Sequence, residues 1–250
     1  MKTLRVVTLA LCFGLLLTSE QNALAGVMPE RTRLIFTEGQ SQRSLMLANT
    51  NSYPVVVQTW IDNGEGDRAP ENAVAPMIVL PSVFRLQPGA LQGLRIIYNG
   101  EPMPKDRESV FWLNLYEIPP TKADTADTSQ VAVAMNTQMK IFYRPRVLPS
   151  LPEHIADKLT FLLEKQDSKW VLVCRNGSPY HASFSSLQVV AATSKYPVAK
   201  TVDMMTPPLS EKRYDLDLSA AMGSEATQVN YTLIDDNGHY ADGKATLLRH

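Results

Sequence analysis

The chain has 250 residues, of which 44% are apolar and 20% are charged, and its formal net charge is −1 at pH 7. This composition excludes an intrinsically disordered chain and a strongly basic nucleic-acid-binding protein. The length is sufficient for one or two globular domains of about 100–200 residues each. We therefore expect a globular protein with no nucleic-acid partner.

The first 25 residues have the features of a secretory signal peptide. Lys2 and Arg5 form a basic start, Val6–Leu17 is a short apolar run, and Ala23–Ala25 is a small-x-small cleavage site. The apolar run is shorter than the ~20 residues that a membrane-spanning helix needs. The sequence therefore predicts export and cleavage after Ala25.

The rest of the chain consists mainly of short apolar or alternating runs separated by turn residues. This pattern is typical of antiparallel β-sandwiches, and no long run has the period of a helix. Clusters such as Asp62-Asn63-Gly64 and Asp236-Asn237-Gly238 supply the turns. The predicted strands are Arg31–Phe36, Leu45–Ala48, Val55–Ile61, Leu94–Tyr98, Val110–Ile118, Val131–Tyr143, Lys158–Leu163, Trp170–Arg175, His181–Val190, Arg213–Leu218 and Gln228–Ile234.

Two segments have the composition of connections. Pro119–Ser129 is polar and joins two strong strand patterns, which indicates a loop. Pro145–Pro152 contains three prolines, which stiffen the chain and end a strand, so we place the domain boundary there. Each side has room for an immunoglobulin-like sandwich of about 100 residues. We expect an all-β protein with a signal peptide (1–25), an N-terminal domain (26–147) and a C-terminal domain (148–250).

Residues that carry chemistry are sparse. Cys12 lies in the signal peptide, so Cys174 is the single cysteine of the mature chain, and we expect it to be a buried apolar residue. The four histidines are His154, His181, His239 and His250, and none has metal-ligand spacing. The sequence contains no nucleophile elbow and no glycine-rich phosphate loop. We expect no enzymatic activity, no cofactor, no metal and no small-molecule substrate.

Gln130–Arg144 is the most informative segment of the chain. Under strict alternation, one face of this strand carries Val131, Val133, Met135, Thr137, Met139, Ile141 and Tyr143. Such a strand is about three times as long as the usual ~5–6 residues. It is either central in a sheet or an edge that a partner covers, because an unprotected apolar edge aggregates. The residues alone favour the central position.

Particular strings of this chain resemble the periplasmic chaperones of the chaperone–usher pilus pathway. The strings are Met139–Pro145, Arg107–Pro120, Arg31–Phe36, Leu86–Gly89, Asn176–Tyr180 and Ile234–Gly238, and the resemblance spans the whole mature chain. It implies two immunoglobulin-like domains in a boomerang arrangement and a periplasmic location. It also implies one-to-one complexes with pilus subunits, which the chaperone delivers to an outer-membrane usher.

The resemblance further implies a mechanism of strand donation. A pilus subunit is an incomplete sandwich, and the chaperone covers the gap with its own long strand. Here the donated strand would be Gln130–Arg144, with Val131, Val133 and Met135 inserted into the groove of the subunit. The alternative is that these three side chains face the interior of the first domain.

Two groups of charged residues match the family. Arg33 and Lys140 match the arginine and lysine that hold the C-terminal carboxylate of the subunit. Lys140 has the opposite parity to the donated side chains, so we expect twist or a bulge to bring it to the cleft. Arg95, Glu108 and Asp236 match three residues that form an ion network between the domains.

The resemblance also narrows the branch of the family. The loop Pro119–Ser129 is short and contains no cysteine, which favours the branch that assembles rod-like pili. A second hypothesis is a two-domain adhesive or fibre-forming surface protein. It is disfavoured because Gly26–Glu30 is too short for a polymerising extension and the mature chain cannot form an internal disulfide.

Overall fold

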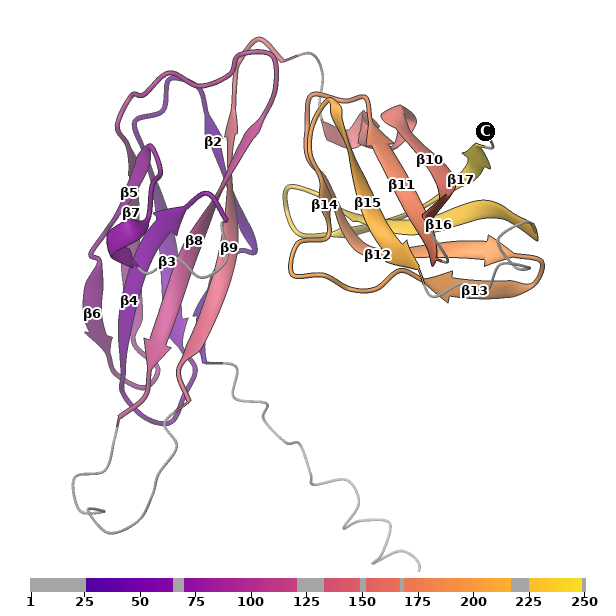
Figure 1. The fold of residues 1–250 in the computed structure, drawn as a ribbon. Coiled ribbons are helices and arrows are strands. Elements are labelled where there is room, and N and C mark those ends of the chain that lie inside the picture. Colours follow the sequence, from indigo (N-terminus) through magenta and orange to yellow (C-terminus); the bar gives the residue numbers. More distant parts are fainter. Residues whose placement is uncertain are drawn as a thin grey trace, which may run out of the picture.

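The computed structural model describes residues 26–64, 70–120, 133–148, 152–166, 169–216 and 225–248. Two β-sandwiches lie side by side at an angle and are joined at one end (Figure 1). No helix in these ranges is long and apolar enough to cross a membrane. The predicted signal peptide, residues 1–25, lies outside the described residues. The predicted all-β class with two immunoglobulin-like sandwiches is confirmed.

The first sandwich is built from two sheets. One sheet has the order β1-β3-β7-β5 and the other has the order β2-β9-β8-β4-β6. The strands are β1 (Val27–Pro29), β2 (Arg33–Thr37), β3 (Gln42–Asn49), β4 (Val55–Asp62), β5 (Met77–Leu80), β6 (Val83–Leu86), β7 (Leu91–Tyr98), β8 (Ser109–Ile118) and β9 (Met135–Arg144), with a 3-10 turn at Pro70–Asn72. Their alternating side chains form one apolar core, including Phe36, Leu94, Leu113 and Ile141.

The start of the first domain crosses from one sheet to the other. β1 pairs antiparallel with β3, and after the short segment that follows Pro29, β2 pairs parallel with β9. Because β2 begins at Arg33, which pairs with Lys140, β2 covers this edge of β9 only from Lys140 to Arg144. The pair Arg33–Lys140 therefore marks the point along β9 at which β2 begins to cover its edge.

The second sandwich has its own core. Its strands are β10 (Leu159–Gln166), β11 (Lys169–Asn176), β12 (Ala182–Ala191), β13 (Ser194–Pro197), β14 (Met205–Thr206), β15 (Ser210–Leu216), β16 (Ala226–Ile234) and β17 (Tyr240–Leu248), preceded by 3-10 turns at Pro152–Lys158. The order is β13-β12-β16-β17-β10-β11-β15, and a short parallel pairing of β17 with β10 connects the two layers. Phe161, Phe184, Tyr214 and Tyr231 form the aromatic centre of the core.

Each predicted strand overlaps one strand of the structure. The sequence did not predict β1, β5, β6, β13, β14 and β17, which are short or carry few apolar residues. β17 shows the cause, because Ala241, Gly243 and Ala245 replace the large apolar residues that would mark an alternating strand. These strands form because the sheet offers hydrogen-bonding partners, and not because of their own propensity.

Cys174 lies in β11 and is fully buried in the second core, as predicted. Burial raises the pKa of its thiol to about 12, so the thiolate form is negligible at neutral pH. A free cysteine in this state behaves as a small apolar residue.

Candidate functional site

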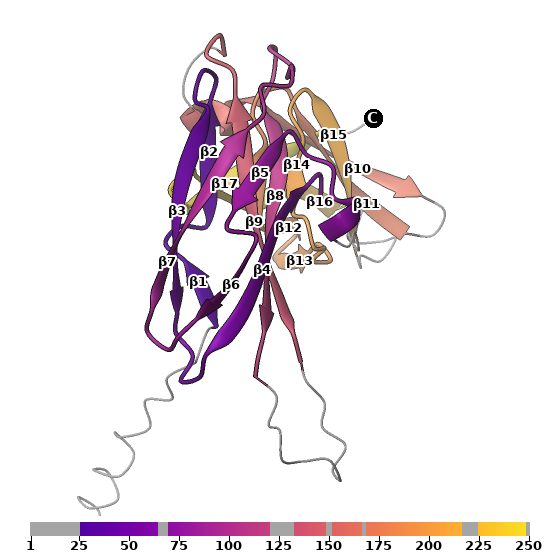
Figure 2. The same cartoon turned by 90° about the vertical axis from the view of Figure 1, so that its left-hand side faces the viewer.

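β9 has two halves with different neighbours. Lys140–Arg144 lies between β8 and β2, and it is therefore central in the sheet. Met135–Met139 pairs with β8 on one side only, and no described strand pairs with its other edge. The ends of β8 and β9 lie beside each other at one end of the first sandwich (Figure 2). The two positions that the sequence left open, central and edge, are thus both present in one strand.

The odd-numbered face of β9 changes from core to solvent along the strand. Met139, Ile141 and Tyr143 are buried in the first core. On the same face, Met135 is 42% exposed, and Val133, which directly precedes the strand, is 73% exposed. Val131, the third predicted donor residue, lies outside the described residues. β9 begins at Met135 and not at Gln130, so within the described residues the strand is shorter than predicted.

The even-numbered face of β9 is turned toward the second domain. Phe142 packs on the ring of His181 with 5.4 Å between centroids, and Lys140 and Arg144 form ion pairs with acidic residues of the second domain. The pairings of β9 with β8 and β2 are continuous, so no bulge is needed. Of the two expected causes, twist or a bulge, the bulge is absent from these pairings, and alternation along β9 places Lys140 on the face that is turned toward the cleft.

Arg33 and Lys140 stand side by side at the inner edge of the cleft. They are direct partners in the parallel pairing of β2 with β9. Arg33 is buried, its Nη1 donates to the carbonyl of Ile234 at 3.1 Å, and its Nε has no hydrogen-bond partner among the described residues. Burial lowers the pKa of this guanidinium. Two adjacent cations therefore lie here, and no carboxylate of the described ranges forms an ion pair or hydrogen bond with Arg33.

Arg144 is the centre of an ion network between the domains. Its Nη2 lies 2.7 Å from Glu108 Oε1, and its Nη1 lies 2.7 Å from Asp236 Oδ2. The other oxygen of Glu108 accepts the backbone N–H of His181 at 2.9 Å, and His181 Nδ1 lies 2.8 Å from it. Burial disfavours the charge on Arg144, but its hydrogen bonds and ion pairs with Asp236 and Glu108 raise its pKa overall. Both domains are thus joined through one guanidinium.

Arg95 does not belong to this network. It lies on β7 in the opposite sheet, pairs with Ser44 and Leu80, and is exposed. The prediction that placed Arg95 between Glu108 and Asp236 is corrected to Arg144. The physical reason is that residues of the other sheet on the outward face cannot reach the second domain through the core.

A sharp turn brings Asp236 to the first domain. Asp235 Oδ1 accepts the backbone N–H groups of Asn237 and His239, which closes the loop between β16 and β17. Gly238 has φ of +86°, and a Cβ there would lie 2.7 Å from Thr32 Oγ1 of the first domain. Only glycine allows both the backbone conformation and this close approach. The turn predicted at Asp236-Asn237-Gly238 therefore also forms part of the domain interface.

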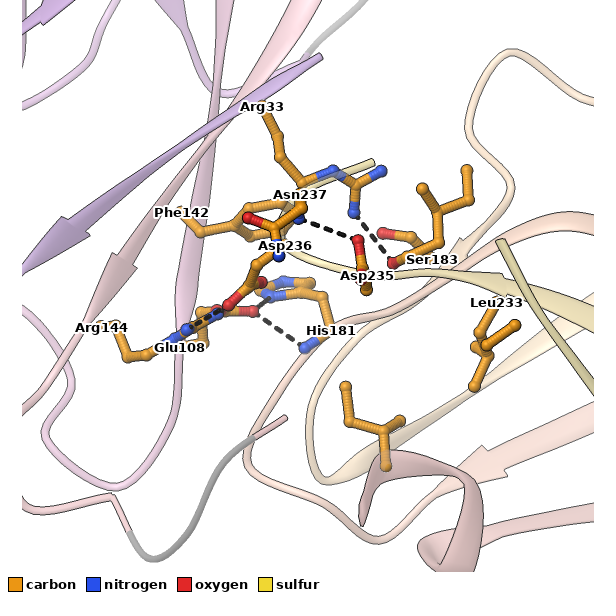
Figure 3. A pocket seen from close by; sticks show the side chains of 13 residues that line it. Arg33, Glu108, Phe142, Arg144, His181, Ser183, Leu233, Asp235, Asp236 and Asn237 are labelled. Carbon is orange, nitrogen blue, oxygen red and sulfur yellow. Dashed lines mark hydrogen bonds and ion pairs between the residues drawn. The ribbon is translucent and has the colours of Figure 1, made fainter. Parts of the chain in front are cut away.

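A cavity of about 200 Å³ lies between the two groups of charges. Arg33, Glu108, Arg144, His181 and Asp236 contribute to its wall (Figure 3). In Figure 3 Arg33 comes from β2 on one side, whereas Asp236 and His181 reach in from the second domain. Within the described residues, no cluster of three or more His, Cys, Asp or Glu side chains could hold a metal ion.

The sequence missed three residues of this interface: Arg144, His181 and Asp203. Arg144 lies inside the family string Met139–Pro145, but the resemblance did not assign it to the ion network. The four histidines are scattered in the chain and lack metal-ligand spacing, so the sequence carries no signal that His181 contacts Glu108. Asp203 pairs with Lys140 from a connection between β13 and β14 that carries no recognisable pattern.

Comparisons with known proteins agree with this architecture. Residues 26–149 match the family described as "Pili and flagellar-assembly chaperone, PapD N-terminal domain", and residues 154–245 match "Pili assembly chaperone PapD, C-terminal domain". The "Probable fimbrial chaperone YadV" of Escherichia coli K12 is 32% identical over 244 residues, which cover 96% of this chain and 97% of that protein. The "Chaperone protein FimB/FhaD" of Bordetella pertussis is 33% identical, covering 90% of this chain and 89% of its own.

Solved structures show the same similarity in three dimensions. The crystal structure of the YadV chaperone superposes with a TM-score of 0.73 at 29% identity, covering 88% of this chain and 99% of that one. The CupB2 chaperone of Pseudomonas aeruginosa superposes with a TM-score of 0.68 at 31% identity, covering 88% of this chain and all of the other. With both domains matched in order, this chain belongs to the PapD-like family of pilus-assembly chaperones.

Proposed function

We propose that this chain is a periplasmic chaperone that binds, folds and caps pilus subunits by donating β9, and that it delivers them to an outer-membrane usher. The observation that carries the proposal is the free edge of β9, whose core-facing row continues outward as exposed Met135 and Val133. An unpaired edge offers backbone hydrogen bonds to any strand, and the exposed apolar row adds burial and register.

The anchor would set the direction of the bound strand. A subunit strand whose C-terminal carboxylate lies at Arg33 and Lys140 can extend along Met135–Met139 only in the same direction as β9. It would then continue the line of β2, which pairs with β9 in parallel. Charge-assisted hydrogen bonds to a carboxylate are about twice as strong as neutral ones. The two cations would therefore determine which residues of the subunit meet Val133 and Met135.

The size of the apolar contribution is appreciable. Each large apolar side chain that becomes fully buried contributes roughly 1.5–3 kcal/mol. Met135 is the more adaptable of the two described side chains, because its unbranched thioether fits grooves of different shape. This property suits a chaperone that serves several subunits. We expect Val131 to add a third contact, and we expect residues 1–25 to direct export before cleavage after Ala25.

The test compares one charge at two positions on the same face of the strand. Val133→Asp places a carboxylate at an exposed site, so the melting temperature of the free protein should shift by only a few degrees. In a complex the same charge would be buried without a partner, which costs several kcal/mol, and the yield of one-to-one complex from the periplasm should collapse. The matched variant Ile141→Asp, at a fully buried position, should unfold the first domain.

Two results would overturn the proposal. One is a normal yield of soluble complex from Val133→Asp with co-expressed subunit. The other is a melting temperature that collapses in Val133→Asp as it does in Ile141→Asp, because Val133 would then be a core residue. Ladders of this chain with itself, in place of one-to-one complexes, would support a fibre-forming protein.

A further inference from the structure

Lys140, the second cation of the proposed anchor, already has an acidic neighbour. Its Nζ lies 3.0 Å from Oδ1 of Asp203, which belongs to the second domain. The side chains are 22% and 34% exposed, so a ligand entering the cleft can reach both. In the free protein, the position beside this ammonium is therefore occupied by a carboxylate of the chain itself.

The second domain holds Asp203 in place through its backbone. Lys212 Nζ donates to the carbonyl oxygen of Asp203 at 2.6 Å, and Thr201 Oγ1 donates to the same carbonyl at 3.0 Å. Lys212 Nζ also lies 3.3 Å from Asp203 Oδ2. One oxygen of the carboxylate thus has its own cation within the second domain, and the other oxygen is directed at Lys140.

The contact with Lys140 is close but poorly aligned. Asp203 Oδ1 is buried and accepts no hydrogen bond among the described residues, although the ammonium is 3.0 Å away. An ion pair without hydrogen-bond geometry lacks the added strength of charge-assisted bonds. An incoming carboxylate that aligns with Lys140 would therefore be the better partner.

Arg33, which lies beside Lys140, also has an incomplete set of hydrogen bonds. This guanidinium donates to a carbonyl oxygen and leaves Nε without a partner in the described part of the chain. Arg144, in contrast, is held by two carboxylates. The two cations of the proposed anchor therefore have weak partners in the described part of the chain, whereas the nearby Arg144 has two well-placed carboxylates.

We propose that Asp203 is an internal substitute for the C-terminal carboxylate of the subunit. This inference rests on the proposed function. In the free chaperone Asp203 neutralises Lys140, and a bound strand must displace it. Its return to Lys140 opposes the bound state, so Asp203 weakens subunit binding and favours release. The ligand class at this position is the α-carboxylate of a peptide strand.

Two synthetic peptides test the proposal on the full mature protein. They share one sequence of alternating apolar residues, and one ends in a free carboxylate whereas the other ends in an amide. For Asp203→Asn, the dissociation constant of the acid peptide should fall by about 2- to 5-fold, in line with a partly exposed ion pair. The constant of the amide peptide should not change. Asp203→Glu keeps the competing charge and should behave like the unchanged protein.

The matched control is Asp215→Asn. Asp215 is exposed on β15 of the same domain, so this variant removes the same charge without touching Lys140. It should leave both dissociation constants unchanged. Equal tightening in Asp215→Asn and Asp203→Asn would overturn the proposal, because the effect would then come from net charge alone.

The outcomes separate the inference from the proposed function. If the unchanged protein prefers the acid peptide and Lys140→Met abolishes that preference, the anchor is correct. If Asp203→Asn then fails to tighten acid binding, Asp203 is a fixed pin between the domains and the inference is wrong. If the unchanged protein binds both peptides equally and Lys140→Met has no effect, the anchor itself is wrong, and the inference falls with it.

Discussion

Two arginines at the domain interface have opposite environments. Arg144 is held by Glu108 and Asp236, and these carboxylates raise its pKa despite its burial. Arg33 is also buried, but in the described part of the chain it donates only to a carbonyl oxygen, and burial lowers its pKa. A buried cation with full partners stabilises one arrangement of the domains, whereas a buried cation without them has hydrogen-bonding capacity left over. This difference supports our proposal that Arg144 is a structural charge and Arg33 a binding charge.

Glu108→Gln should have the largest effect on the structural side of this comparison. Glu108 is only 3% exposed and contacts both Arg144 and His181. Breaking a buried charge pair costs about 3–5 kcal/mol, and we expect that loss in the free energy that couples the domains. Calorimetry should show separate melting of the two domains, each with a nearly intact core. Small-angle scattering should show a wider range of interdomain angles.

The control for Glu108→Gln is Glu101→Gln, which alters an exposed glutamate of the same domain. It should leave both measurements unchanged. An unchanged scattering profile for Glu108→Gln, together with full chaperone activity, would show that the network does not fix the domain angle.

Asp236→Asn should have a smaller effect on the same network. About a third of this carboxylate is exposed, and Arg144 keeps its two hydrogen bonds to Glu108 when it is lost. Partly exposed ion pairs contribute about 0.2–1 kcal/mol. The domain angle should therefore loosen less than in Glu108→Gln, as measured by scattering. A loss equal to that of Glu108→Gln would mean that Asp236, and not Glu108, is the main partner.

Arg33→Met should change the unfolding free energy less again, but it should abolish subunit protection. The replacement fills a similar volume without a buried charge, and such replacements are often neutral or stabilising. Lys140→Met should act in the same way on function. Normal amounts of soluble subunit and assembled pili from either folded variant would contradict the anchor assignment.

Arg144→Met is the contrasting variant, because it leaves two carboxylates facing each other and should destabilise the interface.

Arg95→Ala should have the smallest effect of all. Arg95 is exposed on the sheet remote from the second domain, and such substitutions usually stay within about ±0.5 kcal/mol. Melting temperature, scattering profile and complex yield should match those of the unchanged protein. A widened domain angle in this variant would restore Arg95 to the network and refute the assignment to Arg144.

The local pattern of the sequence was sufficient to predict most of the fold. Alternation in segments such as Val55–Ile61 and Val110–Ile118 identified strands, because side chains of a strand alternate between core and solvent. The weak strands, such as β17, escaped because their pairing partners determine them. The family string Met139–Pro145 contains Arg144. The resemblance nevertheless assigned the ion network between the domains to Arg95, which the structure corrects to Arg144.

The sequence by itself, together with the family resemblance that it carries, predicted the two-domain β-sandwich class, named Arg33 and Lys140 as an anchor, and revealed the apolar row that includes Val133 and Met135. Only the tertiary structure decided where the row leaves the core, because that point depends on where β2 begins to pair with β9. It also decided which charges meet across the domains, since folding brings Arg144 to Asp236, His181 to Glu108, and Asp203 to Lys140. Alternation is a local property of the chain, whereas the partner of a charge depends on distances that only the folded chain defines.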